Sequence, residues 1–204
     1  MEKLSKEEKK LYLIKKLIGC KKTKIAVFIS GKGSNLKNLI KFSKLASYPF
    51  TINLIISNTS KAKGLKYSKQ FNIKKKIINY DNKLKTDKKI LEILKENKIK
   101  LICLAGFMKI LSKNFIKNFN GKIINIHPSL LPKYKGLNTH YRAIKNGERF
   151  AGCSVHYVTS KLDSGKIILQ KKVKVSKNDN HISLAKKVLK EEHLIYPDAI
   201  KIVL

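Results

Sequence analysis

The chain alternates short, purely apolar runs with longer amphipathic segments, and this alternation restricts its possible folds more than any other feature. The run at 25–29 (IAVFI) is apolar at every position, which is typical of a strand buried on both faces of a sheet. Further runs of strand length and segments of helical periodicity follow in turn. The expected strands are 24–30, 52–57, 75–79, 101–105, 122–127, 154–159 and 166–175. The expected helices are about 34–46, 60–71, 86–97, 112–119, 139–146 and 180–193.

This pattern predicts an α/β domain with three α/β/α layers around a mostly parallel, seven-stranded sheet. The last two expected strands have no clear helix between them, so we expect one antiparallel strand. Neither an internal repeat nor a linker rich in Pro, Gly or Ser divides the chain. We therefore expect one catalytic domain over 23–204.

Residues 1–22 are expected to form a lysine-rich extension, helical or frayed. Its leucines and isoleucines fall roughly on one helical stripe, but it contains three glutamates and no long apolar stretch. It therefore fits neither a transit peptide nor a secretory signal. The whole chain lacks a run of about 18 apolar residues, so no membrane span is expected. The cysteines Cys20, Cys103 and Cys153 are few and widely spaced, which fits a reducing cytoplasm.

The formal net charge of +33 suggests a nucleic-acid-binding protein at first sight. However, Arg142 and Arg149 are the only arginines, and the lysines are spread over every segment. A protein that reads bases usually also has arginines for bidentate contacts or interleaved aromatic residues. We interpret most lysines as solvated surface and expect no specific nucleic-acid partner, only weak attraction to polyanions.

Two polar residues at the end of an apolar run indicate where the chemistry lies. In 122–127 (KIINIH), Asn125 and His127 share one face of the expected strand, and Pro128 should end its pairing. Two satisfied polar groups at a capped strand end are the alternative. The first strand is followed by 30–36 (SGKGSNL), whose glycines and helix start favour a phosphate. This loop matches neither the dinucleotide fingerprint nor a Walker loop, and it could be a simple tight turn.

Five stretches together resemble the phosphoribosylglycinamide formyltransferase family, the folate-dependent enzymes of purine synthesis. They are 29–36 (ISGKGSNL), 104–111 (LAGFMKIL), 125–134 (NIHPSLLPKY), 154–165 (SVHYVTSKLDSG) and 192–197 (EHLIYP). The resemblance covers about 24–204 and implies the Rossmann-like formyltransferase fold. It also implies transfer of the formyl group from 10-formyltetrahydrofolate, as co-substrate, to glycinamide ribonucleotide. No metal is implied, and the sequence has no metal-ligand spacing: His140, His156, His181 and His193 are scattered.

The resemblance assigns roles residue by residue. Asn125 would donate to the oxyanion, His127 would stabilise it and move a proton, and Asp163 would pair with His127 and raise the pKa of the histidine. The ribonucleotide residues implied are Gly31, Gly33, Ser34, Asn35 and Glu192. The folate residues implied are Lys83, Met108, Lys109, Ile110, Leu111, Asn125, Val158, Thr159 and Asp163. Lys83 and Lys109 stand where the family has arginines and lack the planar fork of arginine. The resemblance also suggests a cis Leu131–Pro132 bond.

Two relatives with a similar Asn, His and Asp set are the main alternatives. Methionyl-tRNA formyltransferase normally has an RNA-binding domain after the catalytic one, whereas this chain ends at Leu204. Formyltetrahydrofolate hydrolase normally has a regulatory domain before it, which 22 residues are too short to form. Both lack the phosphate loop in this form. We therefore expect a monomer or weak homodimer that acts on small molecules.

Overall fold

The computed structural model describes residues 22–80 and 83–204, and within them all seven expected strands form one sheet. The spatial order is β3-β2-β1-β4-β5-β6-β7. Their bounds are β1 Thr23–Ile29, β2 Phe50–Ser57, β3 Lys74–Ile77, β4 Leu101–Leu104, β5 Lys122–His127, β6 Phe150–Tyr157 and β7 Ile167–Lys174. β6 runs antiparallel to both of its neighbours, and all other pairs are parallel. The prediction of one antiparallel strand is therefore confirmed.

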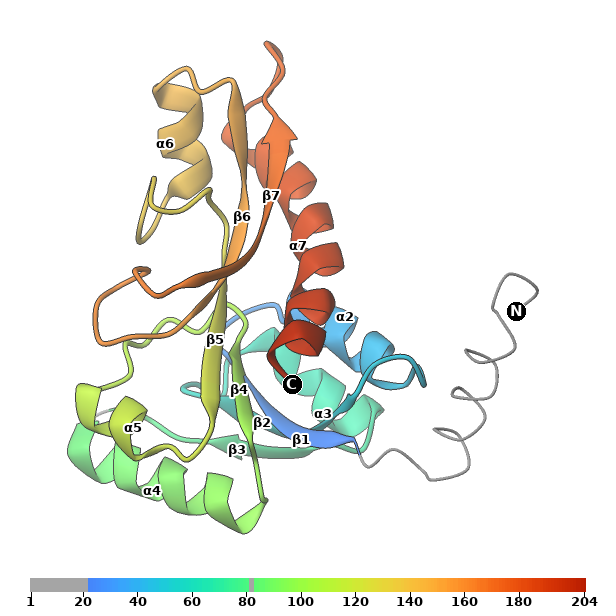
Figure 1. The fold of residues 1–204 in the computed structure, drawn as a ribbon, viewed down its shortest axis with the longest axis vertical. Helices are drawn as coiled ribbons and strands as arrows, with labels where there is room; N and C mark the ends of the chain where they lie inside the picture. The colour runs from blue at the N-terminus through green and yellow to red at the C-terminus, as the bar shows by residue number, and fades with distance from the viewer. Residues whose placement is uncertain (1–21, 81–82) are drawn as a thin grey trace.

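Helices cover both faces of the sheet, which confirms the three layers (Figure 1). The helices are α2 Ser34–Ser43, η1 Lys63–Leu65, α3 Lys66–Gln70, α4 Lys83–Glu96, α5 Lys113–Asn118, α6 Thr139–Lys145 and α7 His181–Val203. β1 shows how the core is divided, because Val27 faces one buried cluster and Phe28 the other. The first cluster includes residues of α2 and α7, and the second includes residues of α4 and α5. A strand in the centre of the sheet therefore needs apolar side chains on both faces, because each face packs against a different cluster.

The last helix is longer than predicted: α7 continues to Val203, whereas the pattern indicated an end near 193. Pro197 lies inside the helix, where a proline normally breaks it because its nitrogen cannot bond the carbonyl four residues earlier. That carbonyl belongs to His193, and the Asn38 side chain donates to it at 2.6 Å. Pro197 itself is buried. The side chain from α2 thus supplies the lost hydrogen bond and lets the helix continue.

The predicted extension over 1–22 lies outside the described residues except for Lys22. The Lys22 ammonium donates to the carbonyls of Ser43 and Leu45, at 2.6 and 2.7 Å, where α2 ends. A cation at a helix C-terminus is favourable because the last carbonyls lack helical partners. Lys22 is therefore bonded to the end of α2, and the boundary predicted between 22 and 23 stays a prediction. Within 22–80 and 83–204, no helix is both long and apolar enough to cross a membrane.

Candidate active site

The carboxyl ends of β1, β4 and β5 open onto one cleft of about 840 Å³. Strand order reverses at β1, since β2 lies on one side of it and β4 on the other, and such reversals create binding crevices in α/β sheets. The cleft is lined by nearly all of the predicted site residues: Gly31, Gly33, Ser34, Asn35, Met108, Lys109, Ile110, Leu111, Asn125, His127, Val158, Thr159, Asp163 and Glu192. Lys83 is the first residue of α4, and its place at the cleft stays a prediction.

His127 is held by a contact at each ring nitrogen. Its Nε2 lies 3.0 Å from the Tyr134 carbonyl oxygen, and its Nδ1 lies 3.5 Å from Asp163 Oδ2. Because a carbonyl oxygen can only accept, Nε2 carries a hydrogen. The other ring nitrogen, Nδ1, faces the carboxylate. The two contacts therefore fix the orientation of the ring.

Asp163 is buried among groups that stabilise its negative charge. Burial alone would raise the pKa of this carboxyl group, but the nearby His156 and His127 and a hydrogen bond from the Gly136 amide hold the pKa below its usual value. The Gly136 amide donates to Oδ2 at 2.9 Å. Asp163 itself has a φ of 43°, in the left-handed region that aspartate tolerates better than most residues. The carboxylate is therefore fixed and charged.

His156 also reaches this cluster, although sequence reasoning grouped it with the scattered histidines. It lies opposite Asn125 in the β5–β6 register. Its Nε2 is 3.3 Å from Asn125 Nδ2 and 3.6 Å from Asp163 Oδ1, while its Nδ1 lies 2.8 Å from the Tyr157 carbonyl oxygen. Only the antiparallel pairing brings His156 beside Asn125, so the single-strand pattern could not have found it.

The turn after β5 is pinned by hydrogen bonds from β6 and β7. The Leu131–Pro132 bond is cis, as the resemblance suggested. The Ser154 hydroxyl donates to the Ser129 carbonyl at 2.6 Å, and the Leu131 amide donates to the Ser154 oxygen at 3.1 Å. Gln170 Nε2 donates to the Leu131 carbonyl at 2.9 Å. These contacts fix the direction of the chain immediately after His127.

The glycine loop forms the opposite end of the cleft. Gly33 has a φ of 72° and precedes α2 without any side-chain cap, so the first amides of this helix have no intrahelical or capping partner. A Cβ on Gly33 would meet the Gly64 Cα at 2.7 Å, so a larger residue fits neither the space nor the conformation. The Ser30 hydroxyl links this loop to the next one by donating to Asn58 and accepting from the Met108 amide. Sequence reasoning missed this link, which depends on loops far apart in the chain.

Glu192 of α7 lies at the same end of the cleft and is almost fully buried. Asn35 Nδ2 donates to its Oε2 at 2.6 Å. Burial raises the pKa of Glu192, and the Asn35 bond only partly opposes this. The site thus contains an acidic group whose charge is incompletely compensated.

An apolar wall of exposed side chains also lines the cleft. Met108 and Ile110 line the cleft and are 62% and 60% exposed, whereas Leu111 is buried in the core. On the other side, the Thr159 hydroxyl donates to the Lys161 carbonyl and contacts Ser164, which shapes the loop that carries Asp163. Such a wall suits a large planar ligand that covers it on binding. No group of three or more potential ligands among residues 22–80 and 83–204 is arranged to hold a metal ion.

Comparison with known proteins agrees with this geometry. The model of the formyl transferase family matches residues 23–200. The phosphoribosylglycinamide formyltransferase of Haemophilus influenzae is 43% identical over 181 residues, which are 87% of this chain and 85% of that protein. The human trifunctional purine biosynthetic protein adenosine-3 is 42% identical over 186 residues, which are 90% of this chain. The chain spans only 18% of the length of that human relative.

Solved structures show the same fold. The phosphoribosylglycinamide formyltransferase of Coxiella burnetii, solved in complex with CHES, has a TM-score of 0.84 and 40% identity, over 88% of this chain and 86% of that one. That of Anaplasma phagocytophilum has a TM-score of 0.82 and 41% identity, over 87% and 84% of the two chains. The family model matches most of the chain, and the fold and the sequence agree over the same region. The chain therefore belongs to the formyl transferase family.

Proposed function

We propose that this protein transfers the formyl group of 10-formyltetrahydrofolate to the amine of N1-(5-phosphoribosyl)glycinamide, a step of purine biosynthesis. The products are formylglycinamide ribonucleotide and tetrahydrofolate. One observation carries the proposal: a single cleft holds Asn125, His127 and Asp163 together with a helix start free for a phosphate and a buried carboxylate suited to an amine. The names of the similar proteins support this choice of substrates.

The catalytic end suits acyl transfer through a tetrahedral intermediate. The substrate amine forms a bond to the formyl carbon, and the bond from this carbon to folate N10 breaks. Asn125 donates a hydrogen bond to the oxygen that becomes negative, and an N–H group of His127 stabilises it as well. His127 also supplies the proton that N10 gains, and the proton that the amine loses returns to His127, so the protons balance. Asp163 keeps His127 oriented.

The opposite end suits the ribonucleotide. The free amides after Gly33, at the positive end of α2, would bind its phosphate. Glu192 would accept hydrogen bonds from the glycinamide amine, which provides the charge compensation that the free protein lacks. Met108, Ile110 and the loop from Val158 to Asp163 would enclose the pterin of the folate, and Lys109 would lie near its acidic tail.

The decisive experiment offers the purified protein 10-formyltetrahydrofolate with and without the ribonucleotide. We expect formation of tetrahydrofolate only when the ribonucleotide is present, in a one-to-one ratio with formylglycinamide ribonucleotide. Folate turnover that does not depend on the ribonucleotide would instead indicate a hydrolase. The His127→Asn variant serves as the control for uncatalysed transfer.

We further propose that the enzyme works in the cytoplasm as a monomer or weak homodimer. The two described cysteines, Cys103 and Cys153, are both buried free thiols, which supports a reducing compartment. Light scattering across a range of protein concentrations tests the oligomeric state. A dimer that persists on dilution would contradict this part of the proposal.

A further inference from the structure

Tyr134 has an unusual backbone conformation beside the catalytic histidine. Its φ is 55°, in the left-handed region, which is unfavourable for a bulky aromatic residue. In this conformation its carbonyl oxygen lies 3.0 Å from Nε2 of His127. Strained residues of this kind persist only where the surrounding structure holds them firmly.

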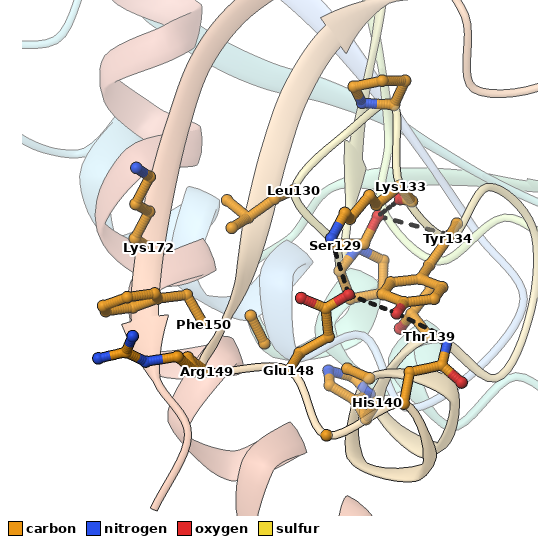
Figure 2. Close-up of a pocket in the computed structure, with 16 residues that line it drawn as sticks. Ser129, Leu130, Lys133, Tyr134, Thr139, His140, Glu148, Arg149, Phe150 and Lys172 are labelled. Carbon is orange, nitrogen blue, oxygen red and sulfur yellow. Dashed lines mark hydrogen bonds and ion pairs between the residues drawn. The ribbon is translucent and has the colours of Figure 1, made fainter.

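The Tyr134 side chain is held from three directions. Its hydroxyl donates to Glu148 Oε1 at 2.7 Å and accepts from Asn146 Nδ2 at 2.9 Å. The Arg142 guanidinium lies over its ring, 4.9 Å from the centroid. Figure 2 shows Glu148 between the Tyr134 hydroxyl and the Lys133 ammonium, at a second hollow of about 560 Å³. Tyr134 is thus anchored from outside the catalytic cleft.

The anchor, which is the set of contacts that holds Tyr134, determines which ring nitrogen of His127 is available to a substrate. Since Nε2–H is bound to the Tyr134 carbonyl, only Nδ1 faces Asp163. The distance of 3.5 Å between Nδ1 and Oδ2 is longer than an ordinary N–H···O bond, so the carboxylate leaves Nδ1 able to bond a substrate atom placed between them. Without the anchor the ring could rotate and present either nitrogen.

We propose that Glu148 is a positioning residue, which acts through the Tyr134 hydroxyl to hold Nε2 of His127 and so makes Nδ1 the working nitrogen. The inference rests on the proposed function only for its effect on turnover. Asp163 of the β6–β7 loop and His140 of α6 are titratable groups that act on His127, and His156 of β6 lies beside Asp163. Among the described residues none of these groups forms a hydrogen bond or ion pair with Nε2, which is held by the Tyr134 carbonyl.

A surface ion pair is the alternative role for Glu148. Its Oε1 also accepts from Lys133 Nζ at 2.8 Å, but the Lys133 side chain is 64% exposed whereas that of Glu148 is 21% exposed. Exposed ion pairs contribute little to stability because water screens them. Lys133→Gln removes this pair without touching the Tyr134 bond, and it is therefore the matched control.

The kinetic test compares Tyr134→Phe, Glu148→Leu, Glu148→Gln and Lys133→Gln. We expect the first two to lower kcat by about 3- to 10-fold, the effect of one lost hydrogen bond, with both KM values unchanged within about 2-fold. Glu148→Gln keeps an acceptor for the hydroxyl and should behave like the wild type, as should Lys133→Gln. The double variant of Tyr134→Phe and Glu148→Leu should be no slower than the slower single variant, because both break the same bond.

The second readout is the ¹⁵N NMR spectrum of labelled histidine, with His127 assigned through His127→Asn. The Nε2 signal of His127 should move in Tyr134→Phe and Glu148→Leu and stay in place in Lys133→Gln. An unmoved signal, with or without a loss of kcat, overturns the proposal, and so does a moved signal with an unchanged kcat. A wild-type protein without formyl transfer would contradict the proposed function, yet the spectra would still test the anchor.

Discussion

Asp163 and Glu192 are both buried carboxyl groups at the ends of one cleft, yet their pKa values move in opposite directions. Burial pushes both upward. Asp163 is surrounded by two histidines and a backbone amide, which reverse the effect of burial. Glu192 has a single neutral donor, the Asn35 amide, which does not. The Asp163 end of the cleft is therefore complete, because its carboxylate has stabilising partners before any ligand binds. The Glu192 end is incomplete, because the Asn35 amide leaves the pKa of Glu192 raised.

This contrast follows from what each end must do. A group that orients a catalytic histidine has to be charged and fixed from the beginning, because reorganisation during the reaction would cost rate. A group that binds an amine gains affinity when the ligand supplies the missing partner, because a buried acceptor without a donor is unfavourable. Substitutions at the two ends should therefore affect different kinetic constants.

The largest effect is expected at the complete end. Asp163→Asn keeps an acceptor for the Gly136 amide but removes the charge that His127 faces, so kcat should fall by about 10²- to 10⁴-fold with little change in either KM. Steady-state kinetics measure this loss, and circular dichroism checks the fold. Among the described residues the Asp198 carboxylate accepts from the Tyr48 hydroxyl and lies outside the cleft, so Asp198→Asn is the control. Near-normal turnover of Asp163→Asn would remove Asp163 from the mechanism.

A smaller and selective effect is expected at the incomplete end. Glu192→Gln retains an acceptor for Asn35 but loses the charge offered to the amine, so kcat/KM for the ribonucleotide should fall by about 10- to 100-fold. The KM for the folate should not change. Titration calorimetry with each substrate separates the two. Equal losses for both substrates would show that Glu192 supports the cleft as a whole.

The apolar wall between the two ends should affect folate binding alone. Ile110→Ser removes apolar area that only a ligand can cover, so the KM for the folate should rise by about 3- to 10-fold at constant kcat. Ile202 is similarly exposed, at 62%, but lies on α7 outside the cleft, and Ile202→Ser is the matched control. If the two variants have the same folate KM, Ile110 does not belong to the folate site.

The smallest effect concerns the pH dependence of the free energy of unfolding. Because the pKa of Asp163 is lowered in the folded state, its stabilisation is present above the unfolded value near 3.8 and is lost as the pH falls through the folded pKa. Because the pKa of Glu192 is raised, its contribution becomes unfavourable as the pH rises from 4.5 through the folded pKa.

Urea unfolding of Asp163→Asn and Glu192→Gln against the wild type, at pH values from about 3 to 8, measures these opposite slopes. The stability deficit of Asp163→Asn should shrink as the pH falls. The relative stability of Glu192→Gln should increase as the pH rises. Parallel curves for the two variants would show that the two carboxyl groups do not differ in this way.

Most of the architecture could be predicted from local pattern. The expected strands all formed, and the central strands β1 and β4 are the buried apolar runs that the pattern indicated, whereas the edge strand β3 (KKKI) is exposed. Asn125 and His127 could be identified because strand alternation and a following proline are local properties. The glycine loop could be identified for the same reason, because glycine is the residue that adopts a positive φ, such as the 72° of Gly33, without strain.

The remaining features depend on contacts between distant segments. α7 passes Pro197 because Asn38 of another helix replaces the lost bond. His156 joins the site through strand register, and Tyr134 is anchored by Glu148, fourteen residues later in the chain. The sequence alone therefore determined which strands form and which polar groups lie at their ends, since both follow from local periodicity. Only the tertiary structure decided how these groups are charged and oriented, because burial and hydrogen-bond partners are properties of the assembled neighbourhood.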